Sequence, residues 1–155
     1  MSKEVYKTSL GYFDPTIGAL RNAYGFGDTK PVEHIDHEVL DSIMKFVGFS
    51  KTKLDASDML HKEHPNLYID FNAIAKGYGV DRVAVYLEGL GVENFMVEIG
   101  GEIFAKGLNP ERNQTWVVGI EAVDSQLTNR TYSHSIKLEN AALAASGNYR
   151  KFRED

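Results

Sequence analysis

Residues 75–105 read AKGYGVDRVAVYLEGLGVENFMVEIGGEIFA, and this stretch combines a helical and a strand-like hydrophobic periodicity. Apolar side chains at helical spacing predict a helix over about 75–90. The helical pattern consists of Val80, Val83, Ala84, Leu87 and Leu90, with Gly91 as the residue that ends it. Apolar residues then alternate over 95–99, and Gly100-Gly101 suits a tight hairpin turn into a second strand at 102–105. A helix followed by a hairpin predicts antiparallel pairing of the strands.

Three shorter helices are expected before this stretch. Residues 4–9 fit the last turns of a helix. Asp14, followed by Pro15 at the first helical position, is expected to cap a second helix. Asp36 is expected to cap a third, which Gly48 ends.

Further strands complete the pattern. They are predicted at 59–62 and 67–70, joined by a turn at 64–66, and later at 116–120, 132–138 and 142–146. Helices come early and strands late, with spacings that suit hairpins rather than crossovers. This order predicts an α+β fold with a largely antiparallel sheet and packed helices.

The composition is that of one globular domain over residues 1–155, of which 43% are hydrophobic. Lys and Arg number 17 against 22 Asp and Glu, a net charge of −5, which argues against a nucleic-acid partner. The absence of Cys excludes disulfides, thiolate metal sites and Cys nucleophiles. No apolar run approaches the roughly 20 residues that span a bilayer.

Several common catalytic and binding motifs are absent or weak in this sequence. The five histidines, His34, His37, His61, His64 and His134, lack the spacing of a zinc-binding helix and are expected at the surface. Neither a nucleophile elbow nor a Walker phosphate loop is present. Gly25-Phe26-Gly27 is either a weak phosphate-loop candidate or a plain turn.

Residues 70–79 carry a stronger signal, because a strand is expected to end at Asp70 and a helix to begin near Lys76. A helix N-terminus attracts phosphate through its free N–H groups. Gly77 and Gly79 would let a ligand approach the backbone closely. Lys76 could offer charge to a phosphate, and Asp70 an acceptor to a hydroxyl or amine. Alternatively, Asp70 only caps the helix and Lys76 is solvated.

A resemblance to a known family rests on four motifs. They are residues 11–20 running on to 24–27, residues 69–81, residues 98–103 with Gly107, and residues 144–149. In this order they resemble motifs of the ApbE-like FAD:protein FMN transferases, formerly called thiamine biosynthesis lipoproteins. The resemblance covers nearly the whole chain.

The resemblance implies a T-fold-like α+β domain that binds FAD and a divalent cation, usually Mg²⁺. Such enzymes transfer FMN from FAD to a Thr or Ser hydroxyl of an acceptor protein and release AMP, although some hydrolyse FAD instead. By position, Tyr12, Phe13 and Asp14 would line the flavin nucleotide, Asp70 and Lys76 would contact FAD, and the backbone carbonyl of Ala73 would meet the metal. The recipient flavoprotein is expected to be another protein, because no acceptor motif is found here.

The resemblance also implies that the chain is the central part of such an enzyme, truncated at both ends. The family's catalytic His and the Asp and Thr of its metal site would lie beyond Asp155, and His134 cannot replace the first of these. The chain is therefore expected not to transfer FMN by itself. Family members are mostly lipid-anchored lipoproteins on the periplasmic or outer side of the bacterial envelope, which is the location expected for the longer protein.

Two other interpretations stay open. The chain could be a non-catalytic module that binds FAD or another flavin nucleotide in the same cleft. It could also be an α+β domain whose glycines serve only turns.

Overall fold

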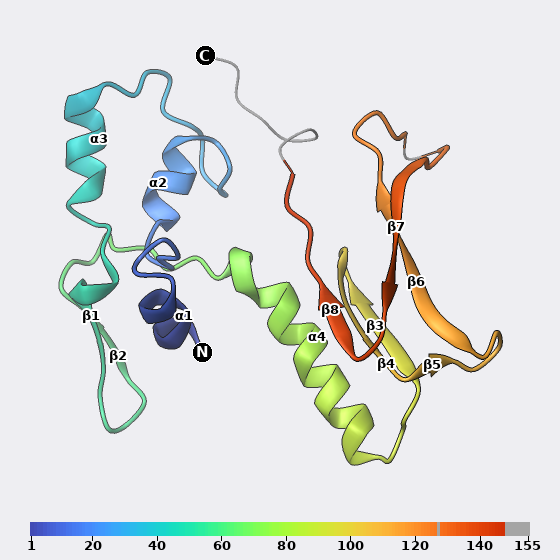
Figure 1. Ribbon diagram of the computed structural model, residues 1–155. Coiled ribbons are helices and arrows are strands. Elements are labelled where there is room, and N and C mark those ends of the chain that lie inside the picture. Colours follow the sequence, from blue (N-terminus) through green and yellow to red (C-terminus); the bar gives the residue numbers. More distant parts are fainter. Residues whose placement is uncertain (127, 148–155) are drawn as a thin grey trace. The chain divides into compact units, whose positions relative to one another are not determined.

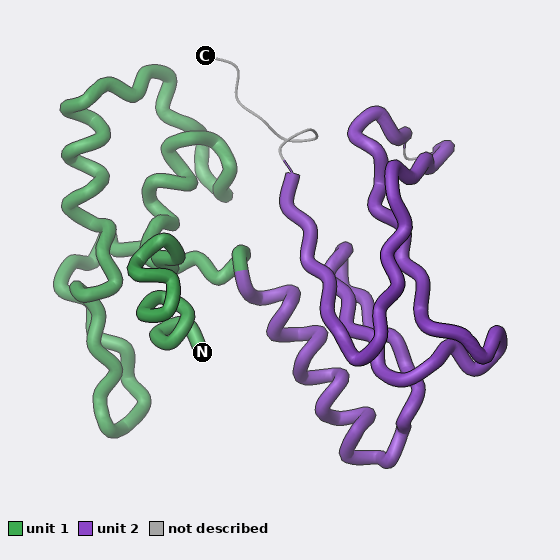
Figure 2. Tube along the Cα trace, viewed as in Figure 1, with its two compact units in different colours: residues 1–73, 153–155 green, residues 74–152 purple. Residues whose placement is uncertain are grey.

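The computed structural model describes residues 1–126 and 128–147 (Figure 1). Contacts within the chain group into two compact units, of which unit 1 spans Met1–Ala73 and unit 2 begins at Ile74 (Figure 2). The expectation of one domain over residues 1–155 stays a prediction.

Unit 1 is mainly helical. Its elements are α1 (Ser2–Thr8), α2 (Gly18–Ala23), α3 (His37–Met44), the short 3-10 helix η1 (Phe49–Lys51), and the strands β1 (Thr52–Leu54) and β2 (Leu60–Lys62). The predicted cap of the third helix is confirmed, because a carboxylate oxygen of Asp36 accepts from the backbone N–H of Val39 at 2.8 Å.

Two helix ends in unit 1 differ from the sequence-based expectation. Asp14 does not cap α2, which begins at Gly18; its carboxylate instead accepts within the preceding loop, from Thr16, and from the N–H of Phe49 after α3. Helix α3 ends at Met44 rather than at Gly48. The Lys51 ammonium donates to three carbonyls at this end, those of Met44, Lys45 and Val47, so a side chain satisfies the groups that the helix leaves free.

The strand pairing in unit 1 also differs. Strand β2 pairs with β1, in the register Thr52↔Lys62 and Leu54↔Leu60, and not with residues 67–70. The reason is a tight loop at 55–59, where one Asp55 oxygen accepts from the backbone N–H groups of Ser57 and Met59. Within residues 67–70 the structure shows only an isolated parallel bridge, between Tyr68 and Ile17.

Unit 2 contains most of helix α4 (Asn72–Gly89) and six strands. The strands are β3 (Phe95–Ile99), β4 (Glu102–Lys106), β5 (Leu108–Asn109), β6 (Gln114–Glu121), β7 (Tyr132–Leu138) and β8 (Ala141–Leu143). They form two antiparallel sheets, in the orders β3-β4-β8 and β5-β6-β7. The predicted long helix, central hairpin and antiparallel α+β fold are confirmed, although the last strand is shorter than expected.

The core of unit 2 has three layers, visible in Figure 1 as a helix and two sheets. Val80 and Ala84 of α4 pack against Phe95 and Val97 on one face of the sheet β3-β4-β8. Alternate residues of β4, Ile103 and Ala105, point to the other face and pack against Val118 of β6 and Leu138 of β7. The predicted alternation of side chains along the strands therefore explains why apolar residues lie on both faces of the sheet β3-β4-β8. Among the described residues, no helix is long and apolar enough to cross a membrane.

Candidate functional site

Asp70 lies in a small polar cluster of unit 1, with only 6% of its side chain exposed. One carboxylate oxygen accepts from the backbone N–H of Asn72 at 2.7 Å, and the other accepts from the guanidinium Nη1 of Arg21. The backbone N–H of Asp70 donates to the carbonyl of Pro15 at 2.7 Å. Asp70 is thus joined to the first motif, residues 11–27, by both its side chain and its backbone.

Opposing effects act on the pKa of Asp70. Burial favours the neutral carboxyl group and would raise the pKa. The N–H of Asn72 and the guanidinium of Arg21 stabilise the anion, and together they hold the pKa of Asp70 below its ordinary value. Asp70 is therefore a charged acceptor at neutral pH, with two donors that fix its orientation.

Helix α4 begins at Asn72, several residues before the expected start near Lys76. Since Asp70 accepts from the first N–H of this helix, the interpretation of Asp70 as a helix-capping group agrees with the structure. A carboxylate oxygen has two lone pairs, so this bond leaves room for a further donor. Capping and ligand binding are compatible at this residue.

Asp14 holds together the loop before α2. Its Oδ1 accepts from the backbone N–H and the hydroxyl of Thr16, at 2.8 and 2.6 Å, and its Oδ2 accepts from the N–H of Phe49 at 3.0 Å. The Thr16 hydroxyl accepts in turn from the N–H of Gly48 at 2.7 Å, and Thr16 is fully buried. The position of Asp14 is explained by this network alone.

The two aromatic residues before Asp14 are placed differently. Tyr12 is 96% exposed, so its ring is available to a ligand. Phe13 is half-buried, and its backbone N–H donates to the hydroxyl of Ser9 at 3.0 Å. All three residues assigned to the flavin by resemblance thus lie in unit 1, beside the segment that Asp70 and Pro15 join.

Lys76 lies in unit 2, in the second turn of α4. Its ammonium donates to the carbonyl of Gly100 and to the carboxylate of Glu102, each at 2.9 Å. These bonds join the motif at 69–81 to the double-glycine turn. The Lys76 side chain is still 45% exposed, so part of its charge faces solvent. Asp70 and Lys76 belong to different compact units.

Ala73 lies at the exposed start of α4, where its backbone carbonyl is a hard oxygen donor of the kind that Mg²⁺ takes. Within residues 1–126 and 128–147, no group of three or more His, Cys, Asp or Glu could hold a metal ion. The donor chemistry of Ala73 fits Mg²⁺, but the described residues do not complete its ligand set. Mg²⁺ commonly takes its remaining ligands from waters and substrate phosphates.

The minor candidates behave as structural residues. Gly25 has a positive φ of 81°, and a Cβ at Gly27 would come within 1.5 Å of the Asn22 amide oxygen, so these glycines form a turn. His61 is exposed and lies 2.6 Å from a carboxylate oxygen of Asp55, whereas His64 stacks against the ring of Phe46. In the last motif, Asn148 and Tyr149 lie outside the described residues.

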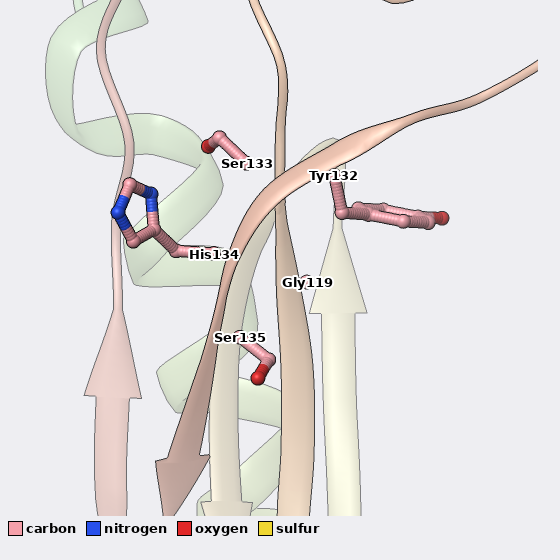
Figure 3. Close-up of a pocket in the computed structure, with 5 residues that line it drawn as sticks. All are labelled: Gly119, Tyr132, Ser133, His134 and Ser135. Atoms are coloured by element: carbon pink, nitrogen blue, oxygen red, sulfur yellow. The ribbon is translucent and has the colours of Figure 1, made fainter.

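An open hollow of about 420 Å³ lies on strands β6 and β7, and none of the predicted site residues lines it. It is lined by Gly119, Tyr132, Ser133, His134 and Ser135 (Figure 3). The ring of Tyr132 occupies the space beside Gly119, since a Cβ there would meet the ring at 2.4 Å. Tyr132 and His134 point to opposite sides of the strand, in keeping with the register shift at this end of the pairing. The packing of Tyr132 beside Gly119 therefore accounts for the hollow.

Two charged residues of the candidate site were missed by the sequence analysis. Arg21 and Glu102 are the partners of Asp70 and Lys76. Arg21 lies in the first motif and Glu102 in the motif at 98–103, but no local pattern pairs them with Asp70 and Lys76, because each pair joins residues far apart along the chain. The signal that could have drawn attention to Arg21 was its position within the first motif.

Comparison with known proteins agrees with the four motifs. The sequence model of the ApbE family matches residues 1–155. The chain belongs to the ApbE family. The predicted family membership is therefore confirmed.

Individual members of the ApbE family show how much of a relative this chain represents. A FAD:protein FMN transferase of Haemophilus influenzae is 40% identical over 153 residues, covering 96% of this chain and 44% of the relative. One of Vibrio cholerae is 39% identical over 145 residues, covering 93% and 42%. The solved flavin transferase ApbE from Vibrio cholerae has a TM-score of 0.79 and 36% identity, covering 99% of this chain and 49% of that one. The chain thus spans less than half the length of these curated relatives.

Proposed function

We propose that this chain forms the FAD-binding part of a flavin transferase that moves FMN from FAD to a protein. The names of its ApbE relatives support the reaction class. The structural observation that carries the proposal is the ionised carboxylate of Asp70, held by Arg21 and the Asn72 N–H and bonded through its backbone to the first motif. Such a fixed anion suits a donor on the nucleotide, for example a ribose hydroxyl or an amine.

The proposed reaction is a phosphoryl transfer. A Thr or Ser hydroxyl oxygen of the acceptor flavoprotein forms a bond to the phosphorus of the FMN half. The bond from that phosphorus to the bridging oxygen breaks, AMP leaves, and the hydroxyl proton is released. Catalysis of this kind depends on positioning and on neutralising the phosphate charge. Hydrolysis of FAD would differ only in the use of water as the acceptor.

Each predicted residue has a role in this proposal. Tyr12 and Phe13 would offer aromatic surface to the flavin nucleotide from a loop that Asp14 holds in place. Lys76 would offer positive charge to the pyrophosphate. A bound Mg²⁺ would supply further neutralisation of phosphate charge, with the carbonyl of Ala73 among its ligands.

Gly77 of α4 supports the proposal of a ligand near the start of the helix. A glycine inside a helix is less stable than alanine by roughly 0.5–1 kcal/mol. Gly79 has a packing reason, because its Cβ would lie 3.2 Å from the Ile99 side chain. A Cβ at Gly77 would meet nothing within 4 Å. Packing within the chain therefore does not require Gly77, whereas a closely approaching nucleotide would.

The proposal extends to the setting of the longer protein. Following the family resemblance, we propose that it lies at the bacterial cell envelope, lipid-anchored and facing the periplasm or exterior, with a separate flavoprotein as acceptor. We expect the 155 residues by themselves to bind FAD without transferring FMN.

The test is a fluorescence titration of the chain with FAD, with FMN as the comparison, in Mg²⁺ and in EDTA. Saturable binding that prefers FAD supports the proposal, and weak Mg²⁺ dependence would fit an incomplete ligand set. A polypeptide with the full length of its relatives, given FAD, Mg²⁺ and an acceptor, should release AMP. Binding without AMP release would favour the non-catalytic module. Absence of FAD binding by the longer polypeptide would contradict both.

A further inference from the structure

We infer that Arg21 is a positioning residue for the flavin nucleotide, because its guanidinium holds the Asp70 carboxylate in the orientation in which Asp70 meets the ligand. This inference rests on the proposed function and deepens it. It assigns a role to a charged residue of the first motif that neither the motif pattern nor the family resemblance marked.

The geometry joins two distant parts of unit 1. Arg21 lies in α2, and Asp70 follows it by 49 residues, immediately before α4. The Asp70 side chain is nearly enclosed, whereas 31% of the Arg21 side chain is exposed. The pair therefore lies close to the surface, with Arg21 on its solvent side.

The carboxylate is held at both oxygens. Arg21 donates to Oδ2 and the N–H of Asn72 donates to Oδ1, so rotation about the last side-chain bond would break one of the two bonds. A carboxylate has about four lone-pair sites, so the group can still accept from a further donor. A preoriented acceptor loses little side-chain freedom when a ligand binds, which favours affinity.

Arg21 is the charged group that favours the ionised form of Asp70. The Tyr68 hydroxyl also interacts with Asp70, and it donates to a carboxylate oxygen of Asp28 at 3.1 Å. The bond to Asp28 raises the pKa of Tyr68, so Tyr68 stays neutral at physiological pH. Among the residues that the structure describes, Arg21 is the cation that pairs with the Asp70 carboxylate. Without it, burial would raise the pKa of the carboxyl group against only the hydrogen bonds from the backbone and side chain of Asn72.

A purely structural role for Arg21 makes a different prediction. If the pair only fastens α2 to the segment before α4, its loss should lower stability and leave the affinity of the folded chain for FAD unchanged. If Arg21 positions Asp70, affinity should fall in a pH-dependent way, because a carboxyl group whose pKa has risen loses its charge as the pH falls.

The experiment compares the wild-type chain with Arg21→Gln, Arg21→Lys and the control Arg82→Gln. Arg82 is an exposed arginine of α4 with no ion pair among the described residues, so the control removes the same charge elsewhere. FAD affinity is measured by fluorescence titration between pH 5 and pH 8, and the melting temperature is measured by circular dichroism at each pH.

We expect Arg21→Gln to weaken FAD binding about tenfold at pH 7 and further toward pH 5, since a lost charge-assisted hydrogen bond is of this order. Arg21→Lys keeps the charge but loses the planar fork, so it should weaken binding only severalfold and keep the flat pH profile of the wild type. Arg82→Gln should behave as wild type. Unchanged affinity and an unchanged pH profile in Arg21→Gln would overturn the inference and leave the proposed function intact.

Two further outcomes of this experiment can be distinguished from each other. If Arg21→Gln does not fold, Arg21→Lys carries the test, because one point donor in place of the planar fork should weaken binding severalfold. Equal affinity of Arg21→Lys and wild type would then overturn the inference. If the wild-type chain itself does not bind FAD, the proposed function fails for this chain, and the inference fails with it.

Discussion

The ammonium of Lys76 lies 2.9 Å from the carboxylate of Glu102 and 2.9 Å from the carbonyl oxygen of Gly100. One side chain of α4 thereby joins the helix to the turn between β3 and β4. A Cβ at Gly100 would lie 3.1 Å from the Lys76 side chain, so the turn glycine makes room for this contact. The same contact places an anion beside the cation that we propose for phosphate binding.

Replacing Glu102 tests whether Lys76 is available to phosphate. Glu102→Gln should tighten FAD binding severalfold, because it removes the anion that competes for Lys76. Stability should change by about 0–1 kcal/mol, as is usual for a partly exposed pair. Glu88→Gln is a matched control, since Glu88 also pairs with a lysine, Lys106 at 2.8 Å. Equal effects of the two variants on FAD affinity would contradict the role of Lys76.

Gly77 offers a test in which stability and binding change in opposite directions. Gly77→Ala should stabilise the chain by about 0.5–1 kcal/mol, because alanine favours the helix and its Cβ meets no neighbouring atom. FAD binding should weaken if a nucleotide approaches the backbone there. Gly89→Ala, at the other end of α4 and equally without neighbours, should stabilise without changing affinity. Urea unfolding and FAD titration measure the two effects.

Asp70 should make the stability of the chain depend on acidic pH. A carboxyl group whose folded pKa is lowered contributes stability above its unfolded pKa of about 3.9, and this contribution is lost as the pH falls through the folded pKa. Urea unfolding between pH 3 and pH 7 should therefore show a loss of stability below about pH 4. Asp70→Asn should be less stable at pH 7 and should lose less on acidification. Parallel pH profiles for the two proteins would contradict this assignment.

The sequence predicted those elements whose signal is local. The helix at 75–90 and the hairpin at 95–105 were found because their periodicity depends only on neighbouring residues. The pairing of β2 with β1 was missed, because it depends on the Asp55 loop rather than on the strands themselves. At the candidate site, Asp70 stood out at a boundary between strand-like and helical patterns, whereas no pattern could join it to Arg21 across 49 residues.

Thr16 provides the last test, which concerns the scaffold beside the proposed flavin contacts. It is fully buried; its hydroxyl donates to Asp14 at 2.6 Å and accepts from the N–H of Gly48 at 2.7 Å. Thr16→Val keeps the shape of the side chain but leaves the Gly48 N–H and one Asp14 bond unsatisfied. The expected loss is about 1–3 kcal/mol of unfolding free energy.

The control for Thr16 is Thr8→Val, which removes a hydroxyl that only bonds carbonyls of its own helix at an exposed position. Its effect should stay within about 0.5 kcal/mol, as for most surface substitutions. Urea unfolding of both variants measures the difference. If Thr16→Val were no more destabilising than Thr8→Val, the loop that carries Tyr12 and Phe13 would not depend on the Asp14 network. The structural explanation of Asp14 would then be wrong, and a direct contact with the nucleotide would be the better account of that residue.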